Sequence, residues 1–165
     1  MVRLHLGAPT CMRKIDEIYM SEALKEAHQA LKEDEVPVGA VVVYQGKIIA
    51  RGHNQVEKLN DPTAHAEMIA LTSATNHLGS KWLLGASLYV TIEPCSMCAG
   101  ALVLSRIKNV LYGAKDPKTG ACGSVINIIN NKRLNHRIRV KKGISEEECG
   151  FLLTEFFKNK RTRRT

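Results

Sequence analysis

Apolar and polar positions first alternate with the period of a helix. Between about Asp16 and Lys32, apolar side chains recur every three or four residues, and charged residues fill the positions between them. This pattern predicts an amphipathic helix that packs one face onto a core. The apolar positions of the stretch are Ile15, Ile18, Tyr19, Ala23, Leu24, Ala27 and Leu31.

The pattern then changes to that of β-strands. Residues 39–44 and 47–54 are rich in β-branched side chains, and Gln45-Gly46 lies between them. This arrangement predicts a hairpin with a tight turn. Short apolar runs at 88–91 and 109–113 predict two further strands.

Two internal helices are predicted from their start signals. Asp61-Pro62-Thr63 offers capping side chains and a proline ahead of residues 64–78, a stretch that should end near Gly79. Pro94 should begin a second helix that reaches about residue 105. Each of these helices would carry candidate metal ligands in its first turn.

The C-terminal part has one clear element. Residues 125–140 contain short apolar runs with polar breaks and indicate no particular structure. Ser145 followed by Glu148 forms a capping-box pattern and predicts a final helix toward Lys160. The order of elements along the chain favours an α/β fold, in which helices cover a mixed sheet.

Length and composition fit one globular domain, since the chain has 165 residues, of which 44% are hydrophobic. We expect this domain to span residues 13–161. Residues 1–12 show no periodicity, so we expect a disordered or non-native extension, and Met12 could be the natural start. Residues 162–165 would form a basic tail.

The charge and the cysteines add information about partners and location. The formal net charge of +8 favours a polyanionic partner, although a basic protein without such a partner has the same composition. Five cysteines is an odd number, and the N-terminus lacks the apolar run of a signal peptide or membrane helix. We therefore expect reduced thiols, a cytoplasmic location and no membrane partner.

Candidate metal ligands lie in two separate motifs. His65-Ala66-Glu67 opens one predicted helix, and Pro94-Cys95-Ser96-Met97-Cys98 opens another. Cysteines three residues apart share a helix face, and the positive end of the helix favours thiolates. Sulfur and nitrogen donors together favour zinc, and three ligands leave a fourth position for water, as in catalytic zinc sites. Glu67 would then be the catalytic residue that moves protons during hydrolytic deamination.

Other interpretations of these residues remain open at this point. Cys122, His53 or His77 could complete a closed structural zinc site, and the Cys-x-x-Cys pair could be redox-active. We expect Cys11, Cys122 and Cys149 to be ordinary thiols and His28 and His77 to be surface or packing residues.

The chain resembles the bacterial tRNA adenosine deaminases, wobble-specific enzymes of the cytidine-deaminase-like superfamily. The resemblance covers most of the chain, and the motifs that carry it are Glu35 to Ala40, Asp61 to Glu67, Pro94 to Cys98, Gly113 to Asp116, Asn135-His136-Arg137 and Phe156-Phe157. It implies a three-layer α/β/α fold around a five-stranded mixed sheet, one zinc ion per subunit and a homodimer. It also implies that the target adenosine is flipped out of a tRNA anticodon stem-loop into the zinc pocket. A DNA partner is not expected.

The resemblance further implies residues that bind the substrate. Asn54 would hydrogen-bond the flipped adenine, and Val38 with His65 would line its walls. Asp116 would accept from a ribose hydroxyl beside the target, although Asp116-Pro117 could also simply begin a turn. For Phe156 and Phe157, the resemblance implies an aromatic contact to an anticodon-loop base. They could instead be core residues, or one could contact the base while the other lies in the core.

Basic side chains near the C-terminus could bind RNA phosphates or form a solvated face. They are Arg137, Arg139, Lys158, Lys160, Arg161, Arg163 and Arg164. Two rival functions remain: a deaminase of free nucleobases or nucleosides, such as cytosine or guanine, and a non-catalytic zinc protein that binds RNA.

Overall fold

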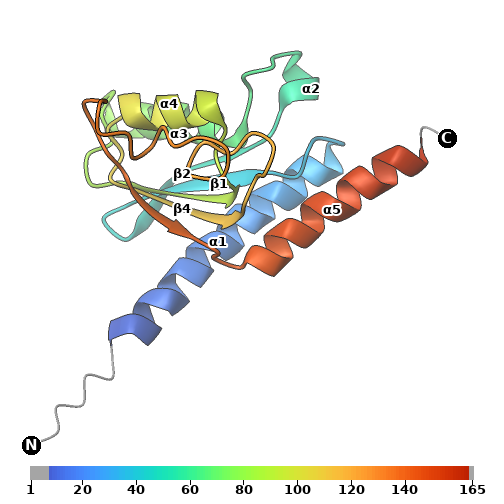
Figure 1. Cartoon of the computed structure of the whole chain (residues 1–165), viewed down its shortest axis with the longest axis horizontal. Coiled ribbons are helices and arrows are strands. Elements are labelled where there is room, and N and C mark those ends of the chain that lie inside the picture. Colours follow the sequence, from blue (N-terminus) through green and yellow to red (C-terminus); the bar gives the residue numbers. More distant parts are fainter. Residues whose placement is uncertain (1–7, 164–165) are drawn as a thin grey trace, which may run out of the picture.

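The computed structural model describes residues 8–163, which form five helices and five strands (Figure 1). The helices are α1 (Ala8–Lys32), α2 (Val56–Leu59), α3 (Ala66–Leu78), α4 (Ser96–Leu104) and α5 (Glu146–Thr162). The strands are β1 (Gly39–Tyr44), β2 (Lys47–His53), β3 (Ser87–Ile92), β4 (Asn109–Ala114) and β5 (Arg139–Lys142).

The five strands form one mixed sheet in the order β2-β1-β3-β4-β5. β1 runs antiparallel to β2 and β3, whereas β3, β4 and β5 are parallel to one another. Gln45 and Gly46 connect β1 to β2 with φ values of 48° and 74°, a conformation that suits the tight turn of a hairpin. The predicted hairpin is therefore confirmed.

Helices cover both faces of the sheet, which gives three layers (Figure 1). The alternation of side chains along β1 shows how the layers are held together. Ala40 and Val42 lie in the core shared with α3 and α4, whereas Val41 and Val43 pack with residues of α1. Both sets are buried because a strand inside a three-layer fold has no solvent-facing side. The predicted five-stranded α/β/α architecture is confirmed.

Two elements were not predicted. α2 has only four residues, none of them buried, so it leaves no periodic apolar signal. β5 lies at the edge of the sheet, and all four of its side chains are exposed. The basic sequence Arg139-Val140-Lys141-Lys142 suits such an edge, because charged side chains discourage pairing with another chain.

The starts of three helices differ from the prediction. α1 begins at Ala8, so residues 8–12 are helical and not disordered, while residues 1–7 of the predicted extension lie outside the described residues. α3 begins at Ala66 and not at residue 64. α4 begins at Ser96 and not at Pro94. α5 begins directly after Ser145, as predicted, but Ser145 is left-handed and makes no side-chain cap hydrogen bond, so the predicted capping box is wrong.

The buried face of α1 also differs in part from the predicted one. Ala23, Leu24 and Ala27 are buried as predicted, but Ile15 and Ile18 are 44% and 60% exposed. The reason is that α1 packs here through a different face. Asp16 and Met20 are buried instead, and Asp16 accepts a hydrogen bond from the Tyr89 hydroxyl of β3 at 2.8 Å.

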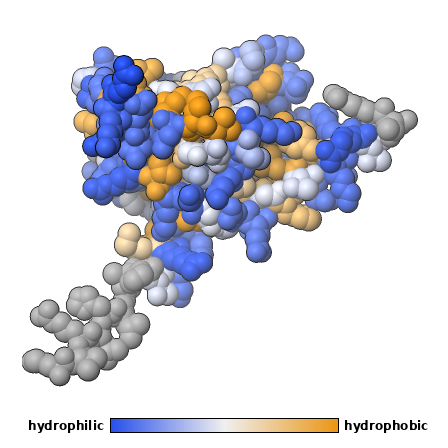
Figure 2. All heavy atoms as spheres, in the orientation of Figure 1, coloured by the Kyte–Doolittle hydropathy of each residue, from blue (hydrophilic) through white to orange (hydrophobic). Residues whose placement is uncertain are grey.

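The remaining surface is mainly hydrophilic, with an apolar patch near the middle of the face shown in Figure 2. Within residues 8–163, no helix combines the length and apolar character needed to cross a membrane.

Candidate active site

The site forms where the starts of two helices meet. His65 is the N-cap residue of α3 and Cys95 is the N-cap residue of α4, both with extended backbone. The sequence analysis had placed both residues inside the first turn, because it began each helix two residues earlier than the structure does. Cys98 follows in the first turn of α4 and is fully buried, whereas His65 and Cys95 are half-buried. The positive ends of both helix dipoles therefore face this group, which favours negatively charged sulfur.

The three donor atoms are close enough to share one metal ion. Nδ1 of His65 lies 3.6 Å from Sγ of Cys95 and 3.6 Å from Sγ of Cys98. All three donor atoms lie within 4.8 Å of one another. A nitrogen and a sulfur ligand on one tetrahedral zinc ion are separated by roughly 3.6 Å, given the usual bond lengths. The residues present therefore fit zinc.

The two thiols are not equivalent. A hydrogen bond from the Cys98 thiol, together with the nearby His65, lowers the pKa of Cys95 to about 4. The same interaction and burial raise the pKa of Cys98. One thiolate is thus already stable at neutral pH, which gives an incoming cation a negatively charged ligand.

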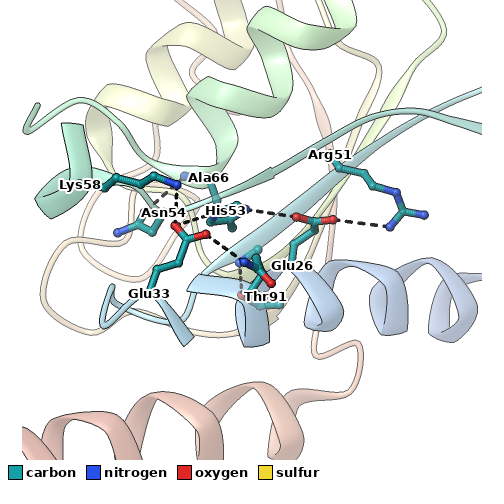
Figure 3. Close-up of polar contacts among 10 residues, drawn as sticks. Glu26, Glu33, Arg51, His53, Asn54, Lys58, Ala66 and Thr91 are labelled. Carbon is teal, nitrogen blue, oxygen red and sulfur yellow. Dashed lines mark hydrogen bonds and ion pairs between the residues drawn. The ribbon is translucent and has the colours of Figure 1, made fainter. Parts of the chain in front are cut away.

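A structural zinc site closed by a fourth protein ligand is not supported. Within the described residues, the group of possible metal donors contains three residues, His65, Cys95 and Cys98. His53 instead lies between Glu26 and Glu33, with ring nitrogens 3.3 and 3.4 Å from their carboxylates (Figure 3). His77 is exposed in the last turn of α3. Cys122 is buried, and it does not belong to the group.

Glu67 lies in the first turn of α3 and is 2% exposed. Burial raises the pKa of its carboxyl group to about 6, although its own backbone N–H and the His65 ring act in the opposite direction. A carboxyl group with such a pKa can both accept and donate a proton near neutral pH.

Asn54 joins the end of β2 to the start of α3. Its side-chain Oδ1 accepts a hydrogen bond from the backbone N–H of Ala66 at 3.3 Å (Figure 3). Its backbone N–H donates to the carbonyl of Val38 at 3.1 Å. Both Asn54 and Val38 are 7% exposed. The structure thus brings two of the predicted substrate-binding residues next to the helix that carries His65 and Glu67.

Asp116 follows β4 and forms a turn. Its Oδ1 accepts from the backbone N–H groups of Lys118 and Thr119, and its Oδ2 accepts from the Thr119 hydroxyl at 2.5 Å. Burial alone would raise the pKa of Asp116, but these hydrogen bonds outweigh it and lower the pKa. The turn interpretation is therefore confirmed, and Oδ2 still has a free lone pair for a further donor.

The sequence reasoning missed Glu93, a buried carboxylate directly before Pro94-Cys95. It accepts hydrogen bonds from the loop that begins at Asp116. A charged residue at the end of a buried strand was the available signal, but the sequence did not indicate which loop would supply the donors.

Three other predicted residues lie apart from this group. Phe156 is 5% exposed, and Phe157 meets it edge-on and is 48% exposed. Arg137 is exposed. Within residues 8–163, no hydrogen bond, ion pair or ring contact joins these three side chains to the group of His65, Cys95 and Cys98.

Comparison with known proteins agrees with this geometry. The sequence model of the MafB19-like deaminase family matches residues 15–161. The tRNA-specific adenosine deaminase of Bacillus subtilis (strain 168) is 50% identical over 149 residues, which are 90% of this chain and 92% of that protein. The chain belongs to the tRNA-specific adenosine deaminase family.

Solved structures of deaminases that act on different substrates share the fold of this tRNA-specific adenosine deaminase family member. A structure of a tRNA:A34 deaminase, which performs A-to-I editing at the wobble position of transfer RNA, superposes with a TM-score of 0.80. It is 45% identical and the match covers 82% of this chain and 99% of that one. The guanine deaminase of Bacillus subtilis superposes with a TM-score of 0.58 at 42% identity, covering 60% of this chain and 64% of that one.

Proposed function

We propose that this deaminase hydrolyses adenosine to inosine at the wobble position of a tRNA anticodon loop. The observation that carries the proposal is the grouping of His65, Cys95, Cys98 and Glu67 at two helix starts, in a chain 50% identical to a tRNA-specific adenosine deaminase. Deamination of a ring by water needs an activated nucleophile and a group that moves protons. This group of residues can supply both.

His65, Cys95 and Cys98 are the proposed zinc ligands, with one ion per subunit. When bound in a site with three protein ligands, zinc lowers the pKa of a coordinated water to about 7 and so provides a nucleophile at neutral pH. The two cysteines also balance the charge of the ion. The N-cap positions of His65 and Cys95 direct their side chains toward the same point, so little rearrangement is needed for binding.

Glu67 is the proposed proton carrier. A carboxylate oxygen of Glu67 takes a proton from the attacking water and delivers it to a ring nitrogen of adenine. The carboxylate then takes the remaining proton from the hydroxyl group added to the ring carbon and passes it to the amine. The carbon–nitrogen bond breaks, the amine leaves as ammonia, and the ring carbonyl of inosine forms. The burial of Glu67 keeps bulk water from competing for these protons, and its pKa of about 6 suits both directions of transfer.

Asn54 and Val38 are the proposed contacts of the flipped base. Because Oδ1 of Asn54 accepts from Ala66, its orientation is fixed, and the amide Nδ2 remains as a donor toward the base. Val38 supplies an apolar wall that is held in place through the hydrogen bond from Asn54. A wall of this kind suits the face of a purine.

Asp116, Phe157 and Arg137 are the proposed contacts to the rest of the anticodon loop. The free lone pair of Asp116 Oδ2 would accept from a ribose hydroxyl, which favours RNA. Phe157 is exposed and can stack on a base, whereas buried Phe156 supports it edge-on. Arg137 can reach phosphates from the surface.

The free-nucleobase deaminase remains the second candidate function. It is favoured by one observation, the match to a guanine deaminase with the same fold. That match covers 60% of this chain, whereas the tRNA-specific adenosine deaminase of Bacillus subtilis is 50% identical over 90% of it. The higher identity over most of the chain therefore favours the tRNA substrate.

We also propose that the protein is a homodimer in the cytoplasm, where tRNA is found. Exposed large apolar side chains support a protein interface: Leu59 at the end of α2 is 54% exposed, and Leu104 at the end of α4 is 76% exposed. Analytical ultracentrifugation tests this arrangement, and a monomer at all concentrations would contradict it.

The proposed function is tested by comparing the products that the protein makes from different substrates. Zinc-loaded protein is given an anticodon stem-loop with adenosine at the wobble position, in parallel with free adenosine, cytosine and guanine. Inosine from the stem-loop alone supports the proposal. Conversion of a free base, with the stem-loop unchanged, would support the second candidate.

A further inference from the structure

The carboxylate of Glu93 organises the loop that follows β4. Glu93 is 1% exposed, and its Oε1 accepts from the backbone N–H groups of Cys122 at 3.0 Å and Ser124 at 3.1 Å. Its Oε2 accepts from the backbone N–H of Asp116 at 3.1 Å and from the Ser124 hydroxyl. Within residues 8–163 no Lys, Arg or His pairs with it, so the loop itself compensates this buried carboxylate.

The packing around Gly120 shows how closely the loop follows this carboxylate. A Cβ atom at Gly120 would lie 2.5 Å from Oε2 of Glu93 and 2.5 Å from the carbonyl oxygen of Asp116. Such distances are far inside van der Waals contact, so only glycine lets the loop backbone approach.

The same loop is tied to the zinc-ligand segment on the other side of Glu93. The N–H of Ala121 donates to the carbonyl of Pro94 at 2.9 Å, and Gly120 pairs with Cys95 in an isolated β-bridge. Asp116, Glu93 and Cys95 therefore belong to one hydrogen-bonded unit. A shift of the loop would therefore move Asp116 relative to Cys95, the proposed zinc ligand.

We propose that Glu93 is a positioning residue that fixes Asp116 relative to Cys95 and thereby sets the preference for ribose over deoxyribose at the target nucleotide. This inference rests on the proposed function, in which Asp116 contacts a ribose hydroxyl. All four partners of Glu93 are donors, and a carboxylate only accepts. Glutamine has nearly the same shape as glutamate, but an NH2 group replaces one of the two accepting oxygens. This NH2 group would face an N–H or hydroxyl donor of the loop, and the hydrogen bond there would be lost.

The test compares E93Q with the wild type on two anticodon stem-loops that carry adenosine or 2′-deoxyadenosine at the wobble position. In zinc-loaded E93Q we expect an unchanged zinc content and a KM for the ribose substrate raised by about tenfold, since a displacement near 1 Å can cost up to about 100-fold. The deoxyribose substrate should be affected much less, so the ratio of the two kcat/KM values falls. E147Q is the matched control, because Glu147 is exposed on α5.

A double-mutant cycle with D116A shows whether Glu93 acts through Asp116. If it does, E93Q/D116A should lose no more activity than D116A alone. The proposal is overturned if E93Q slows both substrates equally, or if the two losses multiply. A wild-type protein that makes no inosine from either stem-loop would instead overturn the proposed function, and this inference with it.

If E93Q does not fold, S124A tests the same link more gently, because it removes only the hydroxyl that donates to Glu93. We expect the ribose preference to fall by about threefold, the usual effect of one hydrogen bond. An unchanged ribose preference in S124A would then overturn the proposal.

Discussion

Sγ of Cys98 lies 3.6 Å from Nδ1 of His65, although 33 positions separate the two residues in the chain. The starts of α3 and α4 carry them, and the sheet between the helix layers holds these starts together. The site is therefore built by the fold and not by a local motif. Its metal affinity should depend on both helix starts.

Replacement of Cys98 by alanine should remove zinc. The variant loses one of three ligands, and we expect the zinc affinity to fall by more than about 100-fold, because even residues that only support ligands change it by up to that factor. Metal analysis after dialysis measures the change. C11A is the matched control, since Cys11 is exposed on α1 and should leave zinc bound. Stoichiometric zinc in C98A would contradict the ligand assignment.

Glu67→Gln should keep zinc but lose turnover. Glutamine cannot carry a proton, so we expect kcat to fall by about 100- to 10,000-fold, with little change in stem-loop binding. Single-turnover kinetics and a binding titration separate these quantities. If the protein were a non-catalytic zinc protein that binds RNA, E67Q and the wild type would not differ in turnover or in stem-loop binding. An active E67Q would rule out Glu67 as the proton carrier.

Gly39→Ala should destabilise the fold, because a Cβ there would lie 2.1 Å from the carbonyl oxygen of Ala23 and 2.3 Å from the backbone nitrogen of Ala27. Overpacking against α1 should cost at least about 1–3 kcal/mol. Gly100→Ala is the control, since its Cβ would meet nothing within 4 Å inside α4. That variant should gain about 0.5–1 kcal/mol. Denaturant unfolding measures both changes, and equal stability of the two variants would contradict the packing of α1 on β1.

The contribution of Glu33 to stability should disappear in acid. Hydrogen bonds from Gln29, Lys58 and His53 lower the pKa of Glu33 from 4.5 to about 2, and Figure 3 shows the last two. Because the folded-state pKa lies below the unfolded one, the stabilisation is complete above pH 4.5 and is lost as the pH falls toward 2. The unfolding midpoints of E33Q and wild type should therefore converge over this interval. A constant difference would contradict the assignment.

Much of the fold could be predicted because its signals are local. The β-branched run of β1, the turn at Gln45-Gly46 and the end of α3 at Gly79 depend on residues close in the chain. β5 could not be predicted, because an exposed edge strand has no apolar alternation and its pairing with β4 depends on distant residues. The same limit applies to Glu93 within the site. Its donors come from positions 23 to 31 residues away, and only the fold brings them together.

The grouping of the candidate zinc ligands could be predicted for a different reason. His65, Cys95 and Cys98 are residue types with few roles, and their positions at two helix starts restrict those roles further. Phe156 and Phe157 show the opposite case. Two adjacent aromatic residues on an amphipathic helix cannot both be buried, but the sequence did not decide which one faces the core.

The most direct test of the account is deamination of the wobble adenosine in water enriched with heavy oxygen. Zinc-loaded protein is incubated with the anticodon stem-loop, and nucleosides are analysed by mass spectrometry, with E67Q and C98A as controls. The account predicts inosine at the wobble position with one heavy oxygen atom on the ring, ammonia in equal amount and no product from either control. Unchanged adenosine in the stem-loop, or inosine without the label, would contradict hydrolysis at this site.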